Sequence, residues 1–123
     1  MALRVLIVDD SESFLDAARV LLERQGMSVV GVALTAAEAC RRAEELQPDL
    51  VLVDITLAEE SGFEVARNLI ENGYGGGAAV ILISTHAEAD FVDLIADSPA
   101  KGFLPKGELS AQAIHRILDG VPS

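Results

Sequence analysis

Short, unbroken runs of apolar residues recur along the chain, and each run ends at a polar residue. In the run Leu50–Val53, four branched apolar residues precede the carboxylate of Asp54. A continuous Val- and Leu-rich run of this length is typical of a strand that is buried on both faces of a sheet. Open α/β sheets bind ligands at the carboxyl ends of their strands, so Asp54 is predicted to lie at a functional edge.

Five such runs alternate with five segments of helical spacing. This alternation predicts an α/β fold, in which five parallel strands form one sheet with helices on both faces. The expected strands are residues 3–8, 28–33, 50–54, 78–83 and 102–104. The first two helices are expected between the cap at Ser11 or Ser13 and the stop at Gly26, and between the cap at Thr35 and Leu46. The other helices are expected at 63–71, 87–97 and 109–118, with an irregular loop at 55–62 and a second loop at 72–77.

The spacing of apolar residues predicts which face of each helix packs on the sheet. The second helix carries a narrow stripe of small residues, which lets a helix lie close to a sheet. The predicted inward residues are Phe14, Ala18, Leu21 and Leu22 in the first helix, Ala36, Ala39, Ala43 and Leu46 in the second, Phe63, Ala66 and Ile70 in the third, and Phe91, Leu94 and Ile95 in the fourth.

Length and charge narrow the class of protein. The 123 residues suit a single domain over 1–123, with residues 119–123 as the start of a linker or C-terminal tail. A formal net charge of -11 disfavours direct binding to nucleic acid or to anionic membranes. Cys40 is the only cysteine, which fits a reducing compartment, and no apolar stretch has the length of a membrane span or of a signal peptide. We therefore expect a cytoplasmic protein.

Polar side chains, namely carboxylates, a hydroxyl and an ammonium, stand at the ends of four of the five strands. Asp9 and Asp10 follow the first strand, Asp54 the third, Ser84 the fourth and Lys106 the fifth. In a parallel sheet these ends meet at one edge, where three nearby carboxylates repel one another strongly. A hard divalent cation relieves that repulsion, and Mg²⁺ prefers such carboxylate ligands together with waters and phosphate oxygens.

The same set of residues suits phosphoryl transfer. A carboxylate is a competent nucleophile toward phosphorus, and the transfer depends mainly on alignment and on neutralised charge. The Lys106 ammonium and Mg²⁺ supply positive charge, and the Ser84 hydroxyl can donate to a phosphoryl oxygen. Neither His86 nor His115 has the spacing of a metal ligand or of an activating base.

Taken together, these motifs resemble a response-regulator receiver domain of two-component signalling over essentially the whole chain. The resemblance rests on Asp9-Asp10, Asp54, Gly62, Ser84 and the segment Phe103-Leu104-Pro105-Lys106. It implies a flavodoxin-like, doubly wound sheet of order 2-1-3-4-5 and phosphorylation of Asp54 by a histidine kinase. It also implies that Asp9, Asp10, Asp54 and the Thr56 carbonyl hold Mg²⁺, that Ser84 and Lys106 contact the phosphoryl group, and that Phe103 changes rotamer on activation.

Several positions depart from the family pattern. Ala58 stands where proline is common, Thr85 where a small alanine is usual, Phe103 where tyrosine is frequent, and Gly107 where proline often follows the lysine. Thr85 is expected to narrow access to the phosphoryl group, and Gly107 to remove the tight cis turn. Thr56 and His86 flank the phosphoryl site by family position, so we expect them to tune the lifetime of the acyl phosphate.

The resulting expectation is a switch that phosphorylates and dephosphorylates itself and has no separate turnover substrate. Its signal would pass through Ser84, Thr85 and Phe103 to a face made of the fourth helix, fifth strand and fifth helix. Expected partners are a sensor histidine kinase or phosphotransfer protein, and a second copy or an effector domain on that face. The alternatives are an aspartate-nucleophile phosphatase, which Thr56 in place of a second acid disfavours, a flavin- or nucleotide-binding domain, and an unphosphorylated receiver-like interaction module.

Overall fold

The computed structural model describes residues 3–57, 60–73, 77–85 and 91–119. The strands are β1 (Arg4–Val8), β2 (Ser28–Ala33), β3 (Leu50–Asp54), β4 (Thr56–Leu57), β5 (Glu60–Ser61), β6 (Ala79–Ser84) and β7 (Gly102–Pro105). The helices are α1 (Glu12–Arg24), α2 (Ala36–Leu46), α3 (Gly62–Glu71), α4 (Val92–Asp97) and α5 (Ala111–Asp119), with a 3₁₀ turn at Lys106–Glu108.

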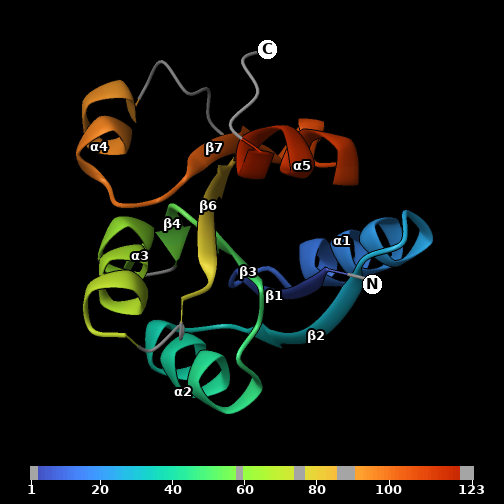
Figure 1. Ribbon diagram of the computed structural model, residues 1–123, viewed down its shortest axis with the longest axis horizontal. Coiled ribbons are helices and arrows are strands. Elements are labelled where there is room, and N and C mark those ends of the chain that lie inside the picture. Colours follow the sequence, from blue (N-terminus) through green and yellow to red (C-terminus); the bar gives the residue numbers. More distant parts are fainter. Residues whose placement is uncertain (1–2, 58–59, 74–76, 86–90, 120–123) are drawn as a thin grey trace.

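Five strands form one parallel sheet in the order β2-β1-β3-β6-β7 (Figure 1). Counting only the strands of this sheet, the order is the predicted 2-1-3-4-5, and the predicted fold class is confirmed. The central strand β3 is buried at every residue, as its unbroken apolar run predicts. Its neighbours β1 and β6 pair with it in register, so the carboxyl ends of the three strands lie side by side.

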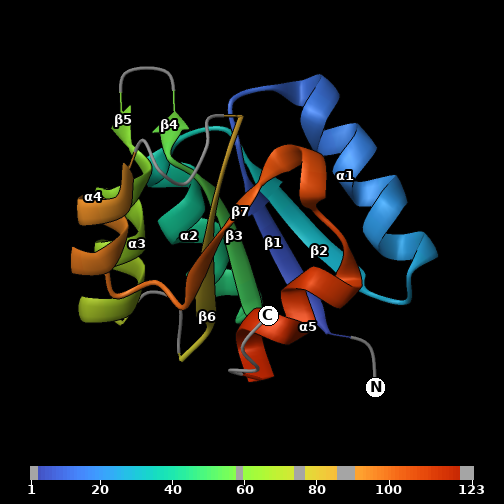
Figure 2. The same cartoon turned by 90° about the horizontal axis from the view of Figure 1, so that it is seen from above.

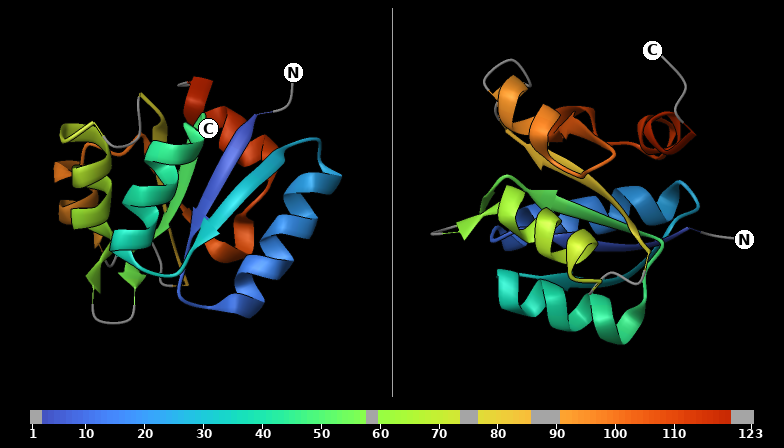
Figure 3. Two further views of the ribbon diagram at one scale, coloured as in Figure 1. Left: turned by 90° about the horizontal axis from the view of Figure 1, so that it is seen from below. Right: turned by 60° about the vertical axis from the view of Figure 1, so that its left-hand side comes forward.

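Two hydrophobic cores lie on opposite faces of the sheet because successive side chains of each strand point to opposite faces. Helices α1 and α5 cover one face, and α2, α3 and α4 cover the other (Figures 2 and 3). In β1, Ile7 contributes to the first core and Val8 to the second. Within the described residues, no helix combines the length and apolar character needed to cross a membrane.

The helix caps follow the sequence closely. The Ser11 and Thr35 hydroxyls accept hydrogen bonds from the backbone N–H groups of Phe14 and Glu38, at 3.4 and 3.2 Å. Gly26 has a φ of 92° just after α1, a left-handed conformation that glycine adopts without steric penalty. The small-residue stripe of α2 is also confirmed, since Ala39 and Ala43 are fully buried against the sheet.

The segment between β3 and α3 differs from the expected irregular loop. Residues Thr56–Leu57 and Glu60–Ser61 pair as antiparallel strands β4 and β5. Figure 2 shows this hairpin at the same end of the sheet as the turn from β1 to α1.

Some predicted helix details are wrong. Leu94 and Ile70 are 53 % and 36 % exposed, so neither is an inward residue of its helix. Helix α5 begins at Ala111 and not at Leu109, because the Ser110 hydroxyl accepts from the Ala113 N–H and caps the helix there. The first part of the expected fourth helix, residues 87–90, lies outside the described residues, as do Ala58 and His86.

Candidate functional site

The polar residues at the strand ends converge at one edge of the sheet. Asp9 directly follows β1, Asp54 and Ser84 end β3 and β6, and Lys106 directly follows β7. Asp9, Asp54 and Ser84 are the buried polar residues of the described chain, with 0, 4 and 0 % exposure. Burial of this kind is unfavourable unless each group is paired or hydrogen-bonded, so the cluster requires a stabilising arrangement.

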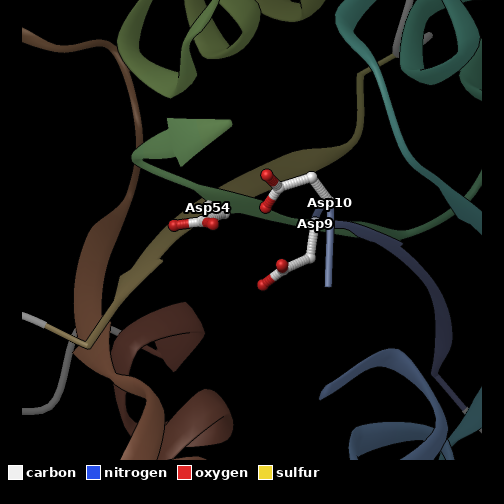
Figure 4. Close-up of side chains that lie close together, drawn as sticks. All are labelled: Asp9, Asp10 and Asp54. Carbon is white, nitrogen blue, oxygen red and sulfur yellow. The ribbon is translucent and has the colours of Figure 1, made fainter. Parts of the chain in front are cut away.

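The three carboxylates form one group. Asp9 and Asp10 reach it from the end of β1 and Asp54 reaches it from β3 (Figure 4). One oxygen from each lies within 4.8 Å of the others, with Asp9 and Asp54 buried and Asp10 exposed to solvent. The predicted meeting of Asp9 and Asp54 across two strands is therefore present.

Lys106 completes the cluster from a third strand. Its Nζ lies 2.5 Å from Asp9 Oδ2 and 3.5 Å from Asp54 Oδ2, and its side chain is only 14 % exposed. The ammonium therefore bridges two buried carboxylates. Apart from this ion pair, Asp9 Oδ2 has no hydrogen-bond partner among the described residues.

Backbone N–H groups hold the other oxygens in place. The Ser11 N–H donates to Asp9 Oδ1 at 2.8 Å, and the Thr56 N–H donates to Asp54 Oδ1 at 3.1 Å. Each bond spans two residues, a local pattern that aspartate forms readily at strand ends. As a result, the Oδ2 atoms of both residues remain directed at the shared space in which Lys106 Nζ lies.

The electrostatic environment raises the pKa of Asp54 above its ordinary value. Burial is the largest cause, followed by the negative charge of Asp9. The Thr56 N–H and the Lys106 ammonium oppose this rise in the pKa because both favour the ionised carboxylate. Without a bound metal ion, ionisation of Asp54 in the folded protein therefore costs free energy.

Gly62 brings the start of α3 directly against Asp54. A Cβ atom at this position would overlap the backbone carbonyl group of Asp54 and the Cα of Ile55. The Gly62 N–H also donates to the Ile55 carbonyl at 2.8 Å. Only glycine permits this approach, which explains the requirement for Gly62 eight residues after Asp54.

The donor set fits Mg²⁺. Carboxylate oxygens are its preferred protein ligands, and a separation within 4.8 Å is close to the about 4.2 Å between opposite ligands of this ion. Three ionised carboxylates against one ammonium leave two negative charges, which one divalent cation balances. Asp9, Asp10 and Asp54 would hold the ion, and the buried Asp9 Oδ2 has no partner among the described residues apart from its ion pair with Lys106.

The other predicted site residues occupy different positions around this cluster. Ser84 is fully buried and pairs with Pro105, next to Lys106. Phe103 is 8 % exposed in the core between the sheet and α2, α3 and α4, whereas Thr85 is exposed. Thr56 contributes its N–H to Asp54, and a metal-binding role of its carbonyl stays a prediction. The described chain contains no cis peptide bond, which agrees with the expectation at Gly107.

Phe14 is a neighbour of the site that the sequence did not reveal. Its ring centroid lies 4.4 Å from Lys106 Nζ, although helical spacing assigned Phe14 only to the inward face of the first helix. Its position in the first turn after Asp9-Asp10 is the one sequence signal that could have indicated this contact.

Comparison with known proteins identifies relatives along nearly the entire chain. A sequence model described as "response regulator receiver domain" matches residues 5–119. The response regulator GacA of Pseudomonas viridiflava is 30 % identical over 116 residues, which cover 94 % of this chain and 53 % of the relative. The chain spans about half to three-fifths of the length of such curated relatives.

Solved structures agree with this match. A two-component response regulator of the LuxR family from Aurantimonas sp. SI85-9A1 has a TM-score of 0.84 and 32 % identity, with 98 % of this chain and 87 % of that chain covered. A response regulator from Burkholderia pseudomallei, solved with a phosphorylated aspartic acid, a calcium ion and citrate, has a TM-score of 0.76 and 26 % identity, with 94 % and 65 % covered.

Proteins of this kind act in two-component signalling systems. Receiver domains are generally signalling switches without a separate substrate, and they typically bind Mg²⁺ at an acidic pocket. The strand order, the acidic cluster and the matched region all agree with that description. The chain therefore belongs to the response regulator receiver domain family.

Proposed function

We propose that this chain is a Mg²⁺-dependent switch that accepts a phosphoryl group on Asp54. One observation carries the proposal: the buried Asp54 carboxylate lies 3.5 Å from Lys106 Nζ and within 4.8 Å of ligand oxygens of two further aspartates. Such an arrangement concentrates a nucleophile and positive charge at one point, which phosphoryl transfer requires.

The transfer forms one bond and breaks another. A carboxylate oxygen of Asp54 attacks phosphorus, and the bond between phosphorus and the donor, a phosphohistidine nitrogen or an acyl oxygen, breaks with its electron pair leaving on the donor. The Thr56 N–H orients the carboxylate, and Lys106 neutralises charge on the phosphoryl oxygens. Bound Mg²⁺ supplies the remaining positive charge.

The product is an acyl phosphate, which water hydrolyses back to the carboxylate. We propose that Thr56 and His86 tune the lifetime of this acyl phosphate. We also propose that the domain has no separate turnover substrate. The exposed position of Thr56, two residues beyond Asp54, supports its share of that role. A sensor histidine kinase or a phosphotransfer protein would be the donor.

Output is proposed to pass through Ser84, Thr85 and Phe103. Phe103 belongs to the core against which Ile95 of α4 packs. A change in the Phe103 rotamer would therefore alter the packing of α4. Figure 1 shows β7 between α4 and α5, and Val92 and Leu94 expose apolar surface on α4. This α4–β7–α5 face would bind a second copy or an effector domain. The receiver domain would cover residues 1–123, with the start of a linker or tail at 119–123, in a cytoplasmic protein.

The test is phosphorylation by a small-molecule donor. The protein is incubated with acetyl phosphate and Mg²⁺, and the intact mass is measured with time. We expect wild type and Asp16→Asn, an exposed aspartate on α1, to gain the mass of one phosphoryl group. Asp54→Asn should gain none, and removing Mg²⁺ with a chelator should stop labelling of wild type.

Two results would contradict the proposal. A mass gain that survives Asp54→Asn would move the phosphorylated residue elsewhere. Wild type that never gains mass with acetyl phosphate or a phosphorylated donor protein would favour the unphosphorylated interaction module.

A further inference from the structure

An aromatic ring covers the ammonium of Lys106 on the side of α1. Phe14 lies in the first turn of α1 and is partly buried, and its ring centroid is 4.4 Å from Lys106 Nζ. A separation below about 6 Å places a cation in attractive contact with the face of an aromatic ring. Lys106 Nζ is therefore surrounded by two carboxylates and one ring face.

We propose that Phe14 is a positioning residue, which holds the Lys106 ammonium beside Asp54 through its aromatic face. The proposal rests on the proposed function for its effect on phosphorylation, although the contact itself does not depend on that function. In this scheme Phe14 acts on Asp54 and on the phosphoryl group only through Lys106.

The need for such a residue follows from the lysine side chain. Its four-carbon stem is flexible, and its compact ammonium is strongly attracted to water. Asp9 and Asp54 attract the ammonium, but a metal ion held by the three aspartates would compete with it for their carboxylates. The Phe14 ring carries no metal-binding atom, so its attraction for Lys106 persists when the carboxylates are engaged.

Ordinary core packing is the competing explanation. Phe14 also packs against the core between the sheet and helices α1 and α5. A purely packing role would make any truncation lower stability, whether or not the ring is aromatic and whether or not Lys106 is present. The two roles therefore differ in their dependence on aromaticity and on Lys106.

The experiment compares Phe14→Leu, which keeps apolar volume, with Phe14→Tyr, which keeps the aromatic face. Leu21→Ala is the matched packing control, because Leu21 lies on α1 and contacts the same core without approaching Lys106 in any contact described. The initial rate of labelling by acetyl phosphate with Mg²⁺ is measured for each variant, alone and combined with Lys106→Ala. The NMR shifts of the Lys106 ε-methylene protons report the ring contact directly.

We expect Phe14→Leu to lower the labelling rate about three- to tenfold, the range for a partly desolvated cation–π contact. Phe14→Tyr should recover most of the rate, and Leu21→Ala should lower thermal stability and leave the rate near wild type. Phe14→Leu should cause no further loss in the Lys106→Ala protein. The ε-methylene protons should move downfield in Phe14→Leu as the ring current is lost.

An unchanged labelling rate in folded Phe14→Leu would overturn the proposal, and so would an equal loss in the Lys106→Ala background. If Phe14→Leu does not fold, Phe14→Met takes its place in both measurements. If wild type itself takes up no phosphoryl group, the proposed function fails, and the ε-methylene shifts alone decide whether Phe14 holds Lys106.

Discussion

At the scale of residues, the site brings negatively charged carboxylates together in a buried position. Asp9 and Asp54 are almost fully buried, and one ammonium serves both of them. The strand-end turns satisfy one oxygen of each carboxylate and leave the other for a cation. The metal-free fold therefore carries an energetic cost that a bound cation would remove.

The raised pKa of Asp54 gives this cost a pH dependence. A carboxyl whose pKa is raised on folding binds its proton more tightly in the folded state, so its favourable contribution is full below the ordinary value of 3.8. That contribution is lost as the pH rises through the folded-state pKa. Without metal at neutral pH, Asp54→Asn should raise the free energy of unfolding by about 1 kcal/mol, and the gain should shrink toward pH 4.

Urea unfolding of both proteins across this pH range measures the difference. Because acids outside the cluster titrate alike in wild type and variant, the difference reports Asp54 together with the charges that contact it. Asp16→Asn, on the exposed side of α1, is the control and should show no such trend. The account is wrong if Asp54→Asn is less stable than wild type at neutral pH without metal.

At the scale of elements, parallel strands bring residues that are distant in sequence to one edge, and a helix start closes the site from the side. Asp9, Asp54 and Lys106 come from the ends of β1, β3 and β7. Helix α3 begins against the backbone of Asp54 and Ile55, which leaves no room for a side chain at Gly62. The position of the nucleophile therefore depends on a helix that carries none of the three acids.

Gly62→Ala tests this dependence. The added Cβ meets backbone atoms, which cannot rotate away, so α3 or the end of β3 must shift. We expect a loss of about 2–3 kcal/mol in the free energy of unfolding, together with weaker Mg²⁺ binding measured by calorimetry. Gly107→Ala is the matched control, since a Cβ there meets no atom within 4 Å. Equal stability of the two variants would refute the close-approach argument.

At the scale of the whole molecule, the formal net charge of -11 opposes association between copies. Against this stand Val92 and Leu94 of α4, which are 54 % and 53 % exposed and would belong to the proposed α4–β7–α5 face. Salt screens the repulsion between charges and leaves apolar burial intact. Self-association through this face should therefore strengthen as ionic strength rises.

Sedimentation of the protein with Mg²⁺ and beryllofluoride, an analogue of the phosphoryl group, measures this association. We expect dimer to form on addition of the analogue, and more of it at about 0.3 M than at about 0.05 M salt. Leu94→Lys should remain monomeric, whereas Val20→Lys, which alters an equally exposed apolar residue on α1, should still dimerise. Wild type that stays monomeric throughout would leave an effector domain as the partner of this face.

Much of the fold was readable from local patterns. The β3 run, the Ser11 and Thr35 caps and the alanine stripe of α2 depend on residues near one another in sequence, and the structure has each of them. The predicted meeting of Asp9, Asp54 and Lys106 also succeeded, because strand order and parallel direction place strand ends together without any knowledge of side-chain conformation.

The features that sequence reasoning missed depend on partners far along the chain. The start of α5 is an example, since the Gln25 side chain at the end of α1 accepts a hydrogen bond from the Ala111 N–H, in addition to the local Ser110 cap. No spacing within α5 encodes this contact with Gln25. The same holds for Phe14, whose ring is an ordinary inward residue until β7 brings Lys106 beside it.

The sequence by itself therefore determined the order of strands and helices, the receiver family and the acids that gather at the sheet edge. Those properties arise from hydrophobic period, cap chemistry and strand direction, all of which act locally or through topology. Only the tertiary structure decided how Lys106 is shared between Asp9 and Asp54, how Gly62 seats α3 on the nucleophile and which apolar residues stay exposed. These depend on distances between side chains that the chain meets only after it has folded.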